Sequence, residues 1–131
     1  LNFNIICPET FKPDMGLYQS AKDKGLSNID ICHDPFLGIK NSDVVYTDVW
    51  ASMGQKEEAD KRRKIFEKYQ VNQRLMQEAK TDAIFMHCLP AERGVEVSDA
   101  VCDSSNSVIF DQAENRMHAQ NAIILRLMQV K

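Results

Sequence analysis

Short apolar segments alternate with longer helical segments along the whole chain, and this alternation limits the fold more than any other feature. Residues 1–7 (LNFNIIC) have the composition of a buried strand, which Pro8 ends. Similar short strands are expected at 29–32, 43–47, 83–86 and 107–110. Because strands separated by helices form parallel βαβ units, the sequence predicts an α/β fold in which a Rossmann-like parallel sheet is flanked by helices.

The expected helices are marked by residues that favour helix ends. Asp14 and Gly25 bound the first helix, and Asn72 is a further N-cap. Asp34, followed by a proline, opens a short helix, and Ser98 opens another. The longer helices are expected over about residues 14–24, 55–69, 72–80 and 114–128. Neither a repeat nor a linker divides residues 1–131, which are therefore expected to form a single domain.

The charge distribution argues against a nucleic-acid partner. The net charge is −3, whereas nucleic-acid binders usually carry a basic stripe. The one basic run, KRRK at 61–64, is preceded at a spacing of four by acidic residues, which favours a solvated helix face over a phosphate-binding patch. Since no apolar run reaches membrane-spanning length either, no membrane partner is expected.

The cysteines and histidines do not form a metal-binding pattern. The four cysteines lack the spacing of a secreted disulfide framework, so reduced thiols in an intracellular protein are the better interpretation. There is no CxxC pair, and the three histidines are scattered, which argues against zinc. No GxGxxG follows a strand, which argues against a nucleotide-binding Rossmann module. Neither a metal nor a cofactor is expected.

Parallel sheets bind their ligands at the carboxyl ends of the strands. This rule selects two loops of the chain without any further information. One follows the third expected strand and the other follows the fourth, and the segment 111–116 is expected to join them. The polar or reactive residues in the two loops are Asp48 and Ser52, and then His87 and Cys88, just before Pro90.

Each of these residues has both a chemical and a structural interpretation. Cys88 could be a nucleophile, a proton acceptor or a substrate contact, but a small core residue is the commonest role of a free cysteine. Adjacent strand residues face opposite sides, so His87 and Cys88 need not form a catalytic pair. Asp48 ends an apolar strand, where it could hold a cationic substrate group or cap the following turn.

Two further sites are open to the same alternatives. Ser52 and Met53 precede Gly54, so this loop could close over a ligand or form an ordinary turn. Arg116 lies near an expected helix N-terminus, where the helix dipole disfavours a cation. An anion could be its partner, or a nearby carboxylate such as Glu114 could pair with it.

Taken together, these stretches resemble the ornithine carbamoyltransferases. The matching motifs are DVWASMG at 48–54, HCLPAERG at 87–94 and AENR at 113–116, and they occur in the order and at the spacing of that family. The first two are highly specific as a pair. The resemblance covers essentially all 131 residues.

The resemblance implies a reaction and a set of residue roles. The family transfers the carbamoyl group of carbamoyl phosphate to the δ-amino group of L-ornithine, giving citrulline and phosphate without metal or cofactor. Asp48 then receives the ornithine α-amino group, while Ser52 and Met53 contact the amino-acid end. An arrangement of Asp48, His87 and Cys88 could assist the δ-amine in losing its proton. For carbamoyl phosphate, the implied contacts are Cys88, the backbone of Leu89, and Arg116.

The resemblance also implies what the 131 residues do not contain. Family enzymes have an N-terminal carbamoyl-phosphate-binding domain, and the first, central strand of their ornithine-binding domain would lie between the strands at 1–7 and 43–47. Residues 1–131 are therefore expected to be a partial domain, inactive alone, of a cytoplasmic or organellar homotrimeric enzyme. The Leu89–Pro90 bond is expected to be cis. The alternatives are a carbamoyltransferase for another amine, such as putrescine or an acylated ornithine, and a non-catalytic α/β scaffold.

Overall fold

The computed structural model describes residues 1–51 and 56–129 and confirms the predicted α/β class. Two single-turn 3-10 helices, Glu9–Phe11 and Glu67–Tyr69, accompany the main elements. In chain order, these are β1 (Phe3–Ile6), α1 (Met15–Asp23), β2 (Ile29–Cys32), α2 (Pro35–Gly38), β3 (Val44–Thr47), α3 (Lys56–Phe66), α4 (Gln73–Met76), β4 (Ile84–His87), α5 (Asp99–Cys102) and α6 (Ile109–Gln129).

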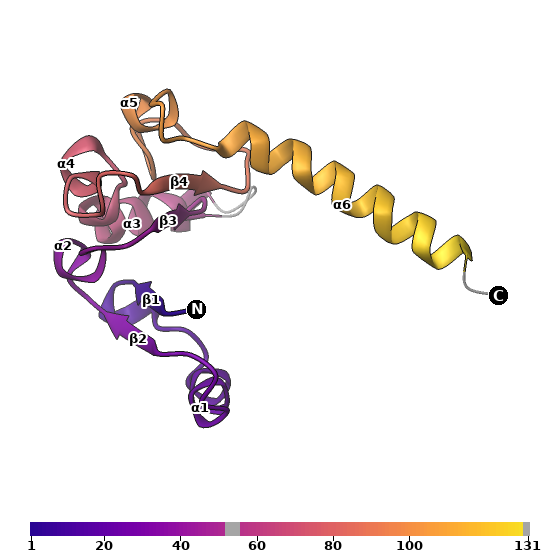
Figure 1. Cartoon of the computed structure of the whole chain (residues 1–131). Coiled ribbons are helices and arrows are strands. Elements are labelled where there is room, and N and C mark those ends of the chain that lie inside the picture. Colours follow the sequence, from indigo (N-terminus) through magenta and orange to yellow (C-terminus); the bar gives the residue numbers. More distant parts are fainter. Residues whose placement is uncertain (52–55, 130–131) are drawn as a thin grey trace.

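The strands form two separate parallel pairs. β1 pairs with β2, from Phe3 opposite Ile29 onward, and β3 pairs with β4, from Val44 opposite Ile84 onward. The strands follow one another in the order β4, β3, β1, β2, so β1 and β3 are the inner edges (Figure 1). No strand of the described residues joins these two edges, which leaves the parallel sheet interrupted at its centre.

Several helix ends follow the predicted capping residues. The side chains of Asp14, Asp34 and Asn72 accept hydrogen bonds from backbone N–H groups in the first turns of α1, α2 and α4. Gly25 has a φ of +62° just after α1, where a left-handed residue ends a helix at little cost. Ser98 precedes α5 as predicted, but its side chain makes no capping hydrogen bond.

Two predicted elements have different bounds. The segment 107–110 is not a strand: Ser107 forms only an isolated bridge with Phe85, and α6 begins at Ile109, five residues before the predicted start. The Gln112 N–H already bonds to the Val108 carbonyl in the helical pattern, and the Ile109 side chain packs into the core from this first turn. The helix expected over 72–80 ends at Met76, after which i→i+3 hydrogen bonds replace the α-helical ones.

The hydrophobic core lies around β4 rather than across the whole sheet. Phe85 at its centre is fully buried, and residues from β3, α4, α5 and the start of α6 surround it. The β1–β2 pair contributes little to this core and is attached to it through α2. Gly38 in α2 lies so close to β1 that an added Cβ would be 2.7 Å from the Ile6 Cγ1 atom.

An aromatic cluster provides a second connection between the two strand pairs. The ring of Phe66 in α3 lies 4.9 Å from that of Phe11 and 5.7 Å from that of Trp50, measured between centroids. Tyr69 packs against Phe66, and its hydroxyl donates a 2.7 Å hydrogen bond to the carbonyl of His33, just after β2. This cluster fixes Trp50 in the segment that follows β3.

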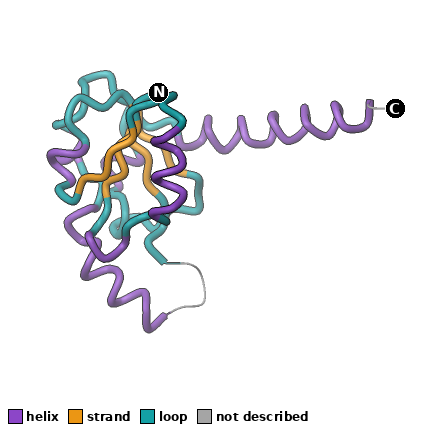
Figure 2. The backbone as a smooth tube through the Cα atoms, turned by 90° about the horizontal axis from the view of Figure 1, so that it is seen from below, coloured by secondary structure: helices purple, strands orange, loops and turns teal. Residues whose placement is uncertain are grey.

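Helix α6 projects away from the rest of the molecule (Figures 1 and 2). Its side chains are exposed from Ala113 to Gln129. Among the described residues, no helix is long and apolar enough to cross a membrane. The exposed apolar side chains on this helix include Met117, Ile123, Ile124, Leu125, Leu127 and Met128.

Candidate active site

The paired carboxyl ends of β3 and β4 bring the predicted residues Asp48 and Cys88 to the same place. Thr47 pairs with His87 at the last position of the ladder, so Asp48 and Cys88 are the next residues on neighbouring strands. Side chains alternate between the two faces of a strand. Val45, Phe85 and His87 face the buried core, and Asp48 and Cys88 lie on the other face.

Cys88 is a partly exposed thiol rather than a core residue. The neighbouring Asp48 carboxylate, followed by burial, raises the pKa of the Cys88 thiol above its ordinary value. The Tyr46 hydroxyl acts in the opposite direction and lowers the Cys88 pKa. The thiol therefore stays protonated beside a carboxylate, so it is a poor thiolate nucleophile near neutral pH.

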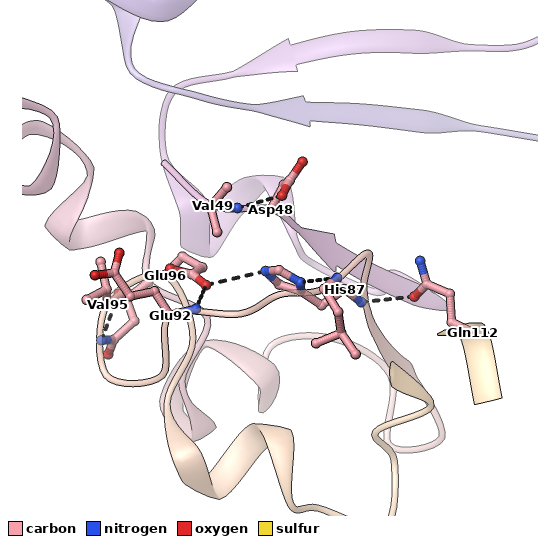
Figure 3. A network of polar contacts seen from close by, with 9 residues as sticks. Asp48, Val49, His87, Glu92, Val95, Glu96 and Gln112 are labelled. Carbon is pink, nitrogen blue, oxygen red and sulfur yellow. Dashed lines mark hydrogen bonds and ion pairs between the residues drawn. The ribbon is translucent and has the colours of Figure 1, made fainter. Parts of the chain in front are cut away.

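Asp48 has the capping role that was one of its two predicted interpretations. Its Oδ1 atom accepts a 2.7 Å hydrogen bond from the backbone N–H of Val49, so it does cap the turn after β3. Its side chain is exposed and also reaches Cys88, so the carboxylate remains accessible to a cation. The carboxylate points away from the buried His87 (Figure 3).

His87 is a buried structural residue in this arrangement. Its Nδ1 atom accepts a 2.9 Å hydrogen bond from the backbone N–H of Leu89 and therefore carries no proton. Its Nε2 atom lies 3.4 Å from the Oε1 atom of Glu96, and both side chains are inaccessible to solvent. Its own backbone N–H donates to the side chain of Gln112 at 3.0 Å (Figure 3). His87 therefore holds the loop that carries Cys88. No hydrogen bond among the described residues joins its ring to the Cys88 thiol.

The same loop contains the predicted cis peptide bond. The Leu89–Pro90 bond is cis, which confirms that prediction. Because the Leu89 N–H is taken by His87, its carbonyl is the backbone group available to a ligand, and no hydrogen bond among the described residues ends on it.

Comparison with known proteins decides the family. The family model described as the Asp/Orn-binding domain of aspartate/ornithine carbamoyltransferases matches residues 1–127. The chain is 55% identical over 127 residues to the chloroplastic ornithine carbamoyltransferase of Pisum sativum, covering 97% of this chain and 34% of that protein. The chain belongs to the aspartate/ornithine carbamoyltransferase family.

Solved structures of the carbamoyltransferase family have the same fold. The Pyrococcus furiosus ornithine carbamoyltransferase matches with a TM-score of 0.83 at 52% identity, over 92% of this chain and 40% of that one. The anabolic enzyme of Campylobacter jejuni matches with a TM-score of 0.88 at 34% identity, over 99% of this chain and 44% of that one. The chain thus spans less than half the length of these relatives.

Two of the carbamoyltransferase motifs are not brought to Cys88 by the described residues. Ser52, Met53 and Gly54 lie outside the described residues. Arg116 is not at a helix N-terminus, because α6 begins at Ile109, so the argument from the helix dipole is wrong. Arg116 is exposed, and within residues 1–51 and 56–129 no ion pair or hydrogen bond joins it to another side chain.

Sequence reasoning missed three residues that shape this candidate site. Glu96 lies between two valines and is fully buried, but nothing in the sequence indicates that this acidic side chain is buried. Tyr46 could have been found from the alternation of β3, which puts it on the face of Asp48. Gln112 was missed because the last helix was predicted to begin at about residue 114, whereas α6 begins at Ile109 and includes Gln112. Among the described residues, no group of three or more histidine, cysteine or acidic side chains could hold a metal ion.

Proposed function

We propose that this chain forms the ornithine side of an ornithine carbamoyltransferase active site. The reaction would transfer the carbamoyl group of carbamoyl phosphate to the δ-amino group of L-ornithine, giving citrulline and phosphate. The observation that carries the proposal is the juxtaposition of Asp48 and Cys88 on the accessible face, at the paired ends of β3 and β4. The names of the relatives from Pisum sativum and Pyrococcus furiosus point to the same activity.

The charge at this face suits a diamino acid. An exposed carboxylate attracts an ammonium group, and a hydrogen bond to a charged partner is about twice as strong as a neutral one. We assign the α-amino group of ornithine to Asp48, and its δ-amino group to the neighbourhood of Cys88. Ser52 and Met53 would contact the amino-acid end from the loop that Trp50 anchors.

The neutral state of Cys88 limits its part in catalysis. A raised thiol pKa disfavours a thiolate that would take a proton from the δ-amine directly. Asp48 would therefore be the final proton acceptor: Cys88 would take the proton of the δ-amine while its own thiol proton passes to the Asp48 carboxylate. His87 would act through the backbone of Leu89. The Leu89 carbonyl would accept a hydrogen bond from the amide N–H of the carbamoyl group.

Carbamoyl phosphate requires more than these residues. A transferring phosphate needs several fixed donors and cations, and of the chain's residues only Cys88, Leu89 and Arg116 are assigned to it. We propose that further polypeptide supplies a phosphate-binding domain and a strand between β1 and β3. The same polypeptide, or another subunit of a homotrimer, would cover the apolar side chains of α6. The pea relative is chloroplastic, so an organellar location belongs to the proposal beside a cytoplasmic one.

Replacing a matching segment tests the proposal. The segment of the Pyrococcus furiosus enzyme equivalent to residues 1–131 is exchanged for this chain, and the product is measured with ornithine, putrescine, N-acetylornithine and aspartate. Citrulline formation, with ornithine as the preferred amine, is expected. A folded chimera that carbamoylates another amine instead would favour a carbamoyltransferase of different specificity. A folded chimera without any transfer would favour the non-catalytic scaffold.

A further inference from the structure

Gln70 holds the loop after β4 (residues 88–97) from outside, although no motif and no role proposed above includes it. It directly follows the 3-10 helix Glu67–Tyr69, and its side chain is half-buried. Its amide nitrogen donates hydrogen bonds to the carbonyls of Gly94 and Val95, at 3.1 and 3.0 Å. Because a side-chain amide nitrogen has two hydrogens, one side chain can fix two consecutive residues of the loop.

The neighbouring Val71 holds the next part of the same loop through its backbone. Its N–H bonds to the carbonyl of Glu96 at 2.9 Å, and its carbonyl accepts the N–H of Ser98 at 3.0 Å. Val71 itself is buried in the core and cannot move without disturbing it. Residues 70–71 therefore form a fixed support for the segment 94–98.

The supported segment leads back to the candidate site through Glu96, which faces His87 (Figure 3). The Oε1 atom of Glu96 lies 3.4 Å from the Nε2 atom of His87. The Nδ1 atom of His87 in turn accepts the N–H of Leu89 at 2.9 Å. Leu89 directly follows Cys88, so a shift of the supported segment would reach both of these residues.

Two ion pairs also reach this loop, but they are exposed. Arg63 pairs with Glu92, and Arg93 pairs with Asp103. Each of the four side chains is at least 38% exposed, and ion pairs of this kind contribute little to stability. The side chain of Gln70 differs from them because it is half-buried and binds the backbone of the loop itself.

We propose that Gln70 is a positioning residue of the carbamoyl-transfer site, which holds the loop after β4 so that Cys88 and Leu89 keep their places beside the substrate. The inference rests on the proposed function, because only in that reaction does the placement of these two residues matter. The α-amino group of ornithine is assigned to Asp48, whose carboxylate accepts the N–H of Val49 in the loop after β3. Loss of the Gln70 hydrogen bonds should therefore slow the transfer step and leave ornithine binding unchanged.

The test measures kcat and the KM for L-ornithine in the full-length protein with Gln70→Met, which keeps the length of the side chain and removes the donor. The kcat is expressed per folded site, counted by calorimetric titration with ornithine, so that a loss of folded protein is not mistaken for slower transfer. We expect kcat to fall by roughly ten- to hundredfold and KM to change by less than about twofold.

Two further variants sharpen the comparison. Gln70→Asn keeps the amide but is one methylene shorter, so its kcat should lie between that of Gln70→Met and that of the unmodified protein. Gln19→Met is the matched control, because the Gln19 amide bonds to Asp23 within α1, far from the loop. It should leave kcat unchanged.

Hydrogen exchange gives a second measurement that needs no turnover. The N–H groups of Leu89, Gly94 and Val95 are all bonded within the loop, and Gln70→Met should speed their exchange by more than about twofold. An unchanged kcat per folded site, or a lower kcat without faster exchange in the loop, would overturn the role of Gln70 and leave the proposed function standing. An unmodified full-length protein that forms no citrulline would instead overturn the proposed function.

Discussion

Removal of the Glu96 carboxylate should destabilise the protein strongly. Glu96 is fully buried, and its Oε1 atom accepts the backbone N–H of Glu92 and faces the Nε2 atom of His87. In Glu96→Ala, the backbone N–H of Glu92 loses its acceptor, and an unpaired group of this kind costs about 1–3 kcal/mol. The cavity left by the fully buried side chain adds to this cost, so a total loss of about 2–5 kcal/mol is expected. That is a large part of an ordinary domain stability of about 5–15 kcal/mol.

The assay is urea unfolding of the protein, with Glu96→Gln as the matched control. Glutamine keeps the acceptor oxygen for the Glu92 N–H and removes only the charge, so it should stay within about 1 kcal/mol of the unmodified protein. Glu96→Ala should also lower the thermal midpoint by on the order of 10 °C. If Glu96→Ala costs less than about 1 kcal/mol, or if Gln and Ala cost the same, the buried contact does not hold this loop.

Three further outcomes are expected. Gly38→Ala should destabilise by about 1–3 kcal/mol in urea unfolding, because its Cβ would lie 2.7 Å from Ile6 Cγ1, whereas Gly16→Ala should be nearly neutral since it meets only an exposed Asp14 oxygen at 3.2 Å. The 131-residue chain alone should form no citrulline in a colorimetric assay; turnover that persists in Cys88→Ala would contradict the assigned site. The isolated chain should self-associate in sedimentation through the inner edges of β1 and β3, and a monomer over a roughly hundredfold range of concentration would contradict this.

The sequence predicted the local structure well where a single residue type determines it. Asp14, Asp34 and Asn72 cap helices because their short side chains accept backbone N–H groups, an effect that needs no tertiary contact. The bounds of β1, β2, β3 and β4 were predicted within one or two residues, because their apolar runs are short and bounded by turn residues.

What the sequence could not predict depends on contacts between distant segments. Residues 107–110 have strand-like composition, but Ile109 packs into the core from the first turn of a helix, where the Gln112 N–H bonds to the Val108 carbonyl. Glu96 is buried only because His87 and Glu92 meet it in space. The exposure of the inner strand edges also depends on distant segments: Phe3, Val44 and Tyr46 are 55%, 46% and 54% exposed, so β1 and β3 are accessible to water.

The charge of Asp48 is the most direct test of the account. In the chimera with the Pyrococcus furiosus enzyme, Asp48→Asn keeps the acceptor for the Val49 N–H and removes the charge offered to ornithine. A lost hydrogen bond to a charged group costs about 1.5–3 kcal/mol, so kcat/KM for L-ornithine should fall by roughly ten- to a hundredfold. If kcat/KM in a folded Asp48→Asn chimera stays within about twofold of the parent chimera, Asp48 does not bind the substrate and the assigned site is wrong.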